Sequence, residues 1–130
     1  MKKVISFLSS KFNVTQEPKN GINASYGYSL LEWLLGNVSS SLKMTQPVAE
    51  DWGWYSMVEW KGRNYLIGAT ALIEEAESSG EVEWIIQINK SRSIKEKILG
   101  REKMKDDDPC FHYFKALIES EAEFIEVKVE

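Results

Sequence analysis

The sequence predicts a single α+β domain over residues 1–130, with helices packed on one face of an antiparallel or mixed β-sheet. Three segments of alternating character follow one another between residues 50 and 89, which is typical of an antiparallel meander. Amphipathic segments with helix-start signals stand on both sides of them. With 43% hydrophobic and 28% charged residues, 130 residues suffice for one core.

The first segment of the meander runs from Glu50 to Lys61 and holds three of the five tryptophans. As a strand with a period of two, it places one group of side chains on a single face: Trp52, Trp54, Ser56, Val58 and Trp60. Such a row of indoles forms either a core or an exposed aromatic platform, and we expect it to point inward. Further strands are expected over 65–73 and 81–89.

Three helix starts can be recognised. Ser29 and Glu32 fit a capping box that opens an amphipathic helix near 27–42. Ser93 and Glu96 fit a second capping box, with Gly100 at the expected stop. The dipeptide Asp108-Pro109 has the form of an N-cap followed by proline at the first helical position. An apolar stripe follows it: Cys110, Phe111, Phe114, Leu117 and Ile118.

The two ends of the chain are expected to be strands. Val4, Phe7 and Leu8 indicate an extended or edge strand near the N-terminus. Residues 124–130 alternate apolar and charged side chains, which predicts a closing strand that is half-buried through Ile125, Val127 and Val129.

Composition limits the function classes. The net charge of −4 and the pI near 5.2 argue against nucleic-acid binding. One cysteine excludes an intrachain disulfide, and no apolar stretch has the length of a membrane span. The basic opening is followed by an apolar run too short for a signal peptide, so we expect a cytoplasmic protein that is not bound to a membrane.

We expect no catalytic, metal or cofactor site. Cys110 and His112 lie two positions apart on a predicted helix and therefore point to different sides, which rules them out as a nucleophile–base pair. The acids of 106–108 with His112 could bind a divalent metal, but three consecutive carboxylates diverge unless the backbone turns tightly.

Charge is distributed unevenly along the chain. Two groups of acidic residues are the candidate partner-binding residues: Glu50 and Asp51 beside the tryptophans, and Glu74, Glu75, Glu77, Glu81 and Glu83 before the third meander strand. They could steer a basic protein partner, or they could do no more than solvate the surface.

Two alternatives remain open. Trp52, Trp54 and Tyr55 beside Glu50 or Asp51 have the composition of a small-molecule or carbohydrate site, with binding or hydrolysis as its activity. An exposed strand edge could instead pair two copies into a homodimer.

The run Glu50-Asp51-Trp52-Gly53-Trp54, followed by the Gly-Arg-Asn-Tyr hairpin and preceded by the Ser29–Leu35 segment, resembles a group of small bacterial proteins. Some members of that group are similar to immunity proteins that neutralise the toxins of neighbouring cells. The resemblance implies a cytoplasmic protein that binds a partner without chemistry, and it implies no catalytic residue.

Overall fold

A computed structural model of the chain describes residues 2–73 and 81–130. Within them seven strands form one sheet, and every strand pair in it is antiparallel. The strands are β1 (Lys2–Ser9), β2 (Lys43–Met44), β3 (Val48–Glu50), β4 (Gly53–Trp60), β5 (Arg63–Leu72), β6 (Val82–Lys90) and β7 (Ile125–Val129). Their order is β2-β4-β5-β6-β1-β7, with β3 also paired to β4. The helices are η1 (Val14–Gln16), α1 (Tyr28–Asn37), α2 (Ile94–Ile98) and α3 (Pro109–Ser120).

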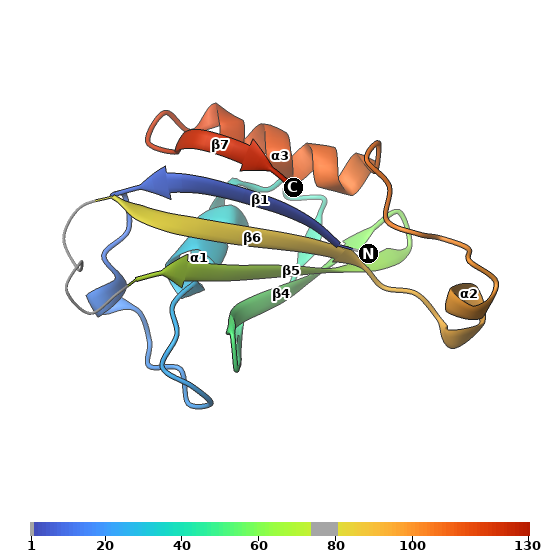
Figure 1. The fold of residues 1–130 in the computed structure, drawn as a ribbon, viewed down its shortest axis with the longest axis horizontal. Helices are drawn as coiled ribbons and strands as arrows, with labels where there is room; N and C mark the ends of the chain where they lie inside the picture. The colour runs from blue at the N-terminus through green and yellow to red at the C-terminus, as the bar shows by residue number, and fades with distance from the viewer. Residues whose placement is uncertain (1, 74–80) are drawn as a thin grey trace.

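The core lies between one face of this sheet and the two longer helices. Figure 1 shows α1 and α3 on one side of the sheet, whereas α2 projects beyond the strand ends. Side chains that point inward along the four long strands are buried, among them Ile5, Val58, Ile67 and Trp84. They meet the buried residues of both helices: Leu30, Leu31, Leu34, Cys110, Phe111, Phe114 and Ile118. The α+β class with helices on one face is therefore confirmed.

The meander is also confirmed, with β4, β5 and β6 as consecutive neighbours. Lys61 and Gly62 make a two-residue turn between Trp60 and Arg63, and their φ angles of 48° and 81° are those of the tight hairpin turns. β1 is not an edge strand, contrary to one of the two expectations for it, because β6 and β7 pair with its two sides.

The capping box predicted at Ser29 is wrong. Helix α1 already begins at Tyr28, and its N-cap residue, Gly27, has no side chain to cap it. The Glu17 carboxylate takes that role by accepting hydrogen bonds from the backbone N–H groups of Gly27, Tyr28 and Ser29 at 3.0, 3.1 and 3.1 Å. A carboxylate at this position also suits the positive end of the helix dipole. The start of α1 is thus fixed by a residue far away in sequence.

Helix α1 is shorter than predicted and ends at Asn37 rather than near residue 42. Val38 has extended backbone angles, and the Asn37 side chain donates to the Trp33 carbonyl at 2.7 Å, which satisfies an acceptor of the last turn. Val38 and Leu42 still pack against the core, but from the segment that follows the helix. The apolar stripe was recognised correctly, and only its helical extent was wrong.

The other helix starts agree with the sequence. Ser93 and Glu96 form the reciprocal capping box of α2, and Gly100, with φ of 66°, follows its end. The Asp108 carboxylate accepts from the Phe111 N–H at 3.1 Å, with Pro109 at the first position of α3.

The closing strand exists but is more exposed than predicted. Ile125 and Val129 are 40% and 39% exposed, and only Val127 packs against the core. Glu126 has a φ of 53°, and the pairing with β1 shifts register there, so the alternation expected for a half-buried strand is interrupted.

No residue of α2 itself is buried, and ion pairs to the sheet help to hold the segment that carries it. Arg63 of β5 donates to both carboxylate oxygens of Glu96 at 2.9 and 2.8 Å, and Lys90 pairs with Glu102 at 2.8 Å. The hydrogen bonds from Arg63, together with the Ser93 N–H, lower the pKa of Glu96 to about 2. Lys90 likewise lowers the pKa of Glu102.

The role of Glu17 is testable by truncation. Replacing Glu17 with alanine leaves the first N–H groups of α1 without their acceptor, so we expect a loss of about 1–2 kcal/mol in the free energy of unfolding. Denaturant unfolding measures this loss. The matched control is Glu32→Ala on the exposed side of α1, which should change stability by less than about 0.5 kcal/mol. A larger loss at Glu32 than at Glu17 would contradict the observed cap.

The ion pair between Arg63 and Glu96 predicts that α2 unfolds locally at low pH. The folded pKa of Glu96 is depressed, so its stabilising effect is complete above its ordinary value of 4.5 and disappears as the pH falls through about 2. Carbon NMR of the Glu96 carboxyl group gives the midpoint, and the amide signals of 93–99 report the loss of the helix. In Arg63→Gln both changes should move to higher pH. An ordinary Glu96 midpoint in the unmodified chain would show that the pair is not formed.

Candidate functional site

The turn that joins β3 to β4 is held by two asparagines. Glu50 pairs with Gly53 across it, so Asp51 and Trp52 form its tip. The buried Asn20 donates to the carbonyls of Glu50 and Gly53 at 3.0 and 2.9 Å. Asn23 donates to the carbonyl of Asp51 at 3.0 Å and to its carboxylate at 3.2 Å. These bonds fix a short loop of the N-terminal region against the tryptophan motif.

Gly53 lets this turn approach β5 closely. A Cβ atom at position 53 would lie 2.4 Å from the Ala69 carbonyl oxygen and 2.6 Å from the Thr70 hydroxyl, so no other residue fits without movement of the backbone. Its φ of 157° is also one that side chains disfavour. The close approach allows the Thr70 hydroxyl to donate to the Trp52 carbonyl at 2.8 Å.

The turn separates Trp52 from the other tryptophans of the motif, which corrects their predicted placement on one face. Trp54, Ser56 and Val58 are buried on the inner face as expected, whereas Trp52 precedes the strand and is 37% exposed. Its ring lies over Gly68, where a Cβ would meet the ring carbons at 2.5 and 2.8 Å. Gly68 pairs with Tyr55 and Gln87, and all three belong to the outer face. The period of two fails because Trp52 belongs to a turn.

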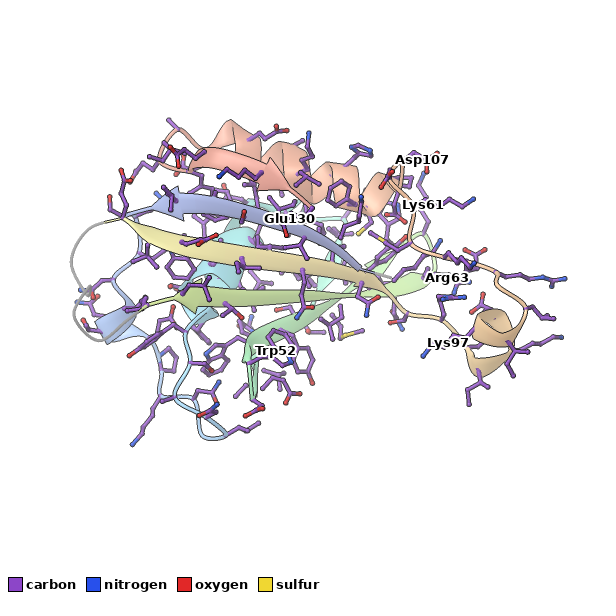
Figure 2. The ribbon with its side chains drawn as sticks, viewed as in Figure 1. Trp52, Lys61, Arg63, Lys97, Asp107 and Glu130 are labelled. Atoms are coloured by element: carbon purple, nitrogen blue, oxygen red, sulfur yellow. The ribbon has the colours of Figure 1, made fainter. Side chains whose placement is uncertain are left out.

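The outer face of the sheet is the most distinctive surface of the described residues. No helix covers it there, and Figure 1 views the sheet from this side. We call it the open face and define it by the outward residues around Trp52 on β1, β4, β5 and β6: Val4, Ser6, Tyr55, Met57, Leu66, Gly68, Thr70, Ile85 and Gln87. None of them carries a charge. Trp52 lies at the margin of this face (Figure 2).

A hollow of about 430 Å³ lies beside the Trp52 ring on the open face. The side chains of Val4 and Ile85 give it apolar walls, and Thr70 and Gln87 add groups that can hydrogen-bond. Because the hollow is broad and open to solvent, it suits a projecting side chain of a partner better than an enclosed small molecule.

Four of the seven candidate acidic residues lie at one end of the sheet, and the other three lie outside the described residues. Glu50 and Asp51 lie at the turn beside Trp52, and the Glu50 carboxylate accepts from the Asp51 N–H at 2.9 Å. Glu81 and Glu83 are exposed at the start of β6, and Glu83 pairs with Leu72 and Leu8 on the outer side. Because β4 and β6 run in the same direction, all four occupy one end of the sheet. Glu74, Glu75 and Glu77 lie outside the described residues.

Cys110 is a core residue rather than a nucleophile. It is fully buried, and burial with the nearby Asp108 raises the pKa of its thiol to about 12. The Asp108 carboxylate also accepts from the Tyr65 hydroxyl at 2.8 Å, and the burial of Tyr65 together with this bond raises the Tyr65 pKa. The exposed His112 contacts the Asp106 carbonyl at 2.8 Å.

Over residues 2–73 and 81–130 no group of three His, Cys, Asp or Glu side chains is arranged to hold a metal ion. In the same part of the chain, no helix combines the length and apolar character needed to cross a membrane.

The chain matches no known family model, no curated protein and no solved structure at a significant level.

Sequence reasoning missed several residues that build this site. The Asn20-Gly21 dipeptide is typical of a turn, and nothing local indicates that the Asn20 amide reaches Glu50 and Gly53. A glycine inside a strand leaves room for a bulky neighbour, and the ring that occupies this room at Gly68 is Trp52, on the outer face. Thr70 and Gln87 carry no signal beyond strand alternation.

Gly53 gives the most direct test of the turn. In Gly53→Ala the new methyl group meets the backbone of β5, and we expect a loss of about 2–3 kcal/mol in the free energy of unfolding. The matched control is Gly36→Ala near the end of α1, where a Cβ meets nothing within 4 Å. That change should stabilise the chain by about 0.5–1 kcal/mol because alanine is the better helix former. Equal effects at the two glycines would contradict the close approach.

Proposed function

We propose that this chain is a cytoplasmic, non-catalytic binding domain that holds a basic protein partner against its open face, in the manner of an immunity protein. The observation that carries the proposal is the placement of Trp52 at the open face, whose defining residues carry no charge. An aromatic ring held in this way is an anchor whose position is fixed before binding, which lowers the entropy cost of association.

The composition of the open face supports a protein partner. The centres of protein interfaces are poor in charge and rich in tryptophan, tyrosine and methionine. The open face brings Trp52, Tyr55 and Met57 together with Leu66 and Ile85. Its polar residues, such as Gln87, can form hydrogen bonds to a partner without the cost of burying a charge.

The acidic end of the sheet supports a basic partner. Glu50, Asp51, Glu81 and Glu83 form no ion pair with any cation in the described part of the chain. Their field therefore remains available to attract positive charge and to orient a partner as it approaches. The resemblance of the Glu50–Trp54 motif to proteins like toxin-neutralising immunity proteins favours the same partner class.

A carbohydrate site is the weaker alternative. Trp54 is buried on the inner face and is unavailable to a sugar, which leaves Trp52 and Tyr55 as the accessible rings of that hypothesis. The Glu50 carboxylate already accepts from the Asp51 N–H.

The proposal predicts which side chains control affinity. A protein captured by the purified chain from extracts of its own organism should be basic, and Trp52→Ala should weaken its binding by at least about thirtyfold. Calorimetry with the purified pair measures this loss. The matched control is Ile98→Ala, which removes a more exposed apolar side chain from the opposite end and should leave affinity unchanged.

Charge-reversal variants distinguish long-range electrostatic attraction of the partner from direct contact with it. In Glu81→Lys/Glu83→Lys the association rate should fall and its dependence on salt should weaken, whereas Glu32→Lys on the helical side should have little effect. A partner whose binding is indifferent to Trp52→Ala would contradict the proposal. Quenching of Trp52 fluorescence by neutral sugars at millimolar concentration would favour the carbohydrate alternative.

A further inference from the structure

The segment 91–105 extends beyond the sheet and displays apolar side chains on a short helix. We call it the α2 excursion, and Figure 1 shows it projecting from the end of the molecule opposite the start of β6. Ile94 and Ile98 are 77% and 79% exposed, and Leu99 is 51% exposed. Ile94 and Ile98 are four residues apart and therefore lie on one side of α2. Three neighbouring exposed aliphatic side chains form a surface that water disfavours.

Hydrogen bonds and one buried side chain hold this surface in place, although its aliphatic side chains are exposed. Arg63 of β5 donates two hydrogen bonds to the Glu96 carboxylate. Arg92 donates to the carbonyls of Arg101 and Glu96 at 2.9 and 3.3 Å, which ties the two ends of the loop together. The buried Met104 anchors the far end in the core. A projecting element fixed by so many bonds is ordered before any partner arrives.

The acidic residues of the α2 excursion are already used in ion pairs, so its exposed cations are available to a partner. Glu96 and Glu102 are occupied by Arg63 and Lys90. Five exposed cations in the excursion make no ion pair with any described residue: Lys95, Lys97, Arg101, Lys103 and Lys105. The surface is therefore both aliphatic and basic on a chain whose net charge is −4.

A hollow of about 390 Å³ extends this surface toward the sheet. Met57 and Leu66 contribute its apolar part, and Arg92 and Lys97 contribute cations. An apolar side chain of a partner could fill it while an adjacent carboxylate meets the cations.

We propose that the α2 excursion is a docking element for a second protein, one that presents acidic residues beside an aliphatic face. The exposed cations favour acidic residues on this partner, and the exposed isoleucines favour an aliphatic face beside those acidic residues. A lipid surface fits less well, because a helix of five residues with two exposed isoleucines, followed by Leu99, inserts little apolar area. Nucleic acid fits less well because the excursion has no aromatic ring to stack on a base. The hollow adjoins the open face through Met57 and Leu66, but the partner proposed here has the opposite charge from the partner of the open face.

The test uses synthetic helical peptides of known composition. One carries a leucine face flanked by glutamates, and the second carries the same leucine face flanked by lysines. Nitrogen–proton NMR of the full chain should show shifts confined to residues 91–105 and the adjoining hollow with the glutamate peptide, and none with the lysine peptide. Ile94→Ser/Ile98→Ser should weaken the glutamate peptide at least about tenfold, and Lys95→Glu/Lys97→Glu should do the same with loss of salt dependence.

Matched controls stand at the other end of the molecule. Ile22→Ser removes an isoleucine that is 60% exposed, and Lys19→Glu reverses an exposed lysine, so both should leave peptide binding unchanged. The proposal is overturned if neither peptide binds, or if both bind equally. It is also overturned if shifts at 91–105 appear only with vesicles containing anionic lipid, or only on raising the protein concentration, since those results would assign the excursion to a membrane or to a second copy.

Discussion

The contact between the backbone of Gly53 and the Ala69 carbonyl is the constraint on which this surface depends. It brings the β3–β4 turn directly against β5, at a distance that excludes every side chain at position 53. The chain therefore leaves the turn with Trp54 pointing into the core and Trp52 on the other side of the sheet. Trp54 therefore contributes to the stability of the core, whereas Trp52 is accessible to a partner on the outer face. In the ordinary alternation of a strand, residues 52 and 54 would share one face.

Two further glycines complete this arrangement. Gly27, just before α1, approaches the same Ala69 carbonyl, and a Cβ there would lie 2.2 Å from the oxygen. Gly68 offers the bare surface on which the Trp52 ring rests. The helix entry, the turn and the aromatic anchor are thus packed around one short stretch of β5. Ala69 belongs to the core and Gly68 to the open face, so this stretch contributes both to the packing of the fold and to the proposed binding site.

Local signals predicted the parts of the fold that depend on neighbouring residues. Strand alternation located the meander, and the starts of α2 and α3 follow from Ser93 and Asp108 because each caps its own helix. The parts that failed depend on distant groups. The cap of α1 comes from Glu17, and the tryptophan turn is fixed by Asn20. No periodicity in the sequence encodes such contacts, and for this reason the face occupied by Trp52 was predicted incorrectly.

The edge strands of the sheet are poorly suited to pairing with another strand, so we expect a partner to bind the face of the sheet rather than its edge. At one edge, β2 and β3 have only two and three residues, and Pro47 stands between them, unable to donate to a new strand. At the other edge, the positive φ of Glu126 interrupts β7. Short edge strands, proline and irregular edges all oppose the pairing of strands between molecules. The self-association considered from the sequence is therefore disfavoured at the described edges, and the open face around Trp52 remains the extended surface that a second protein could cover.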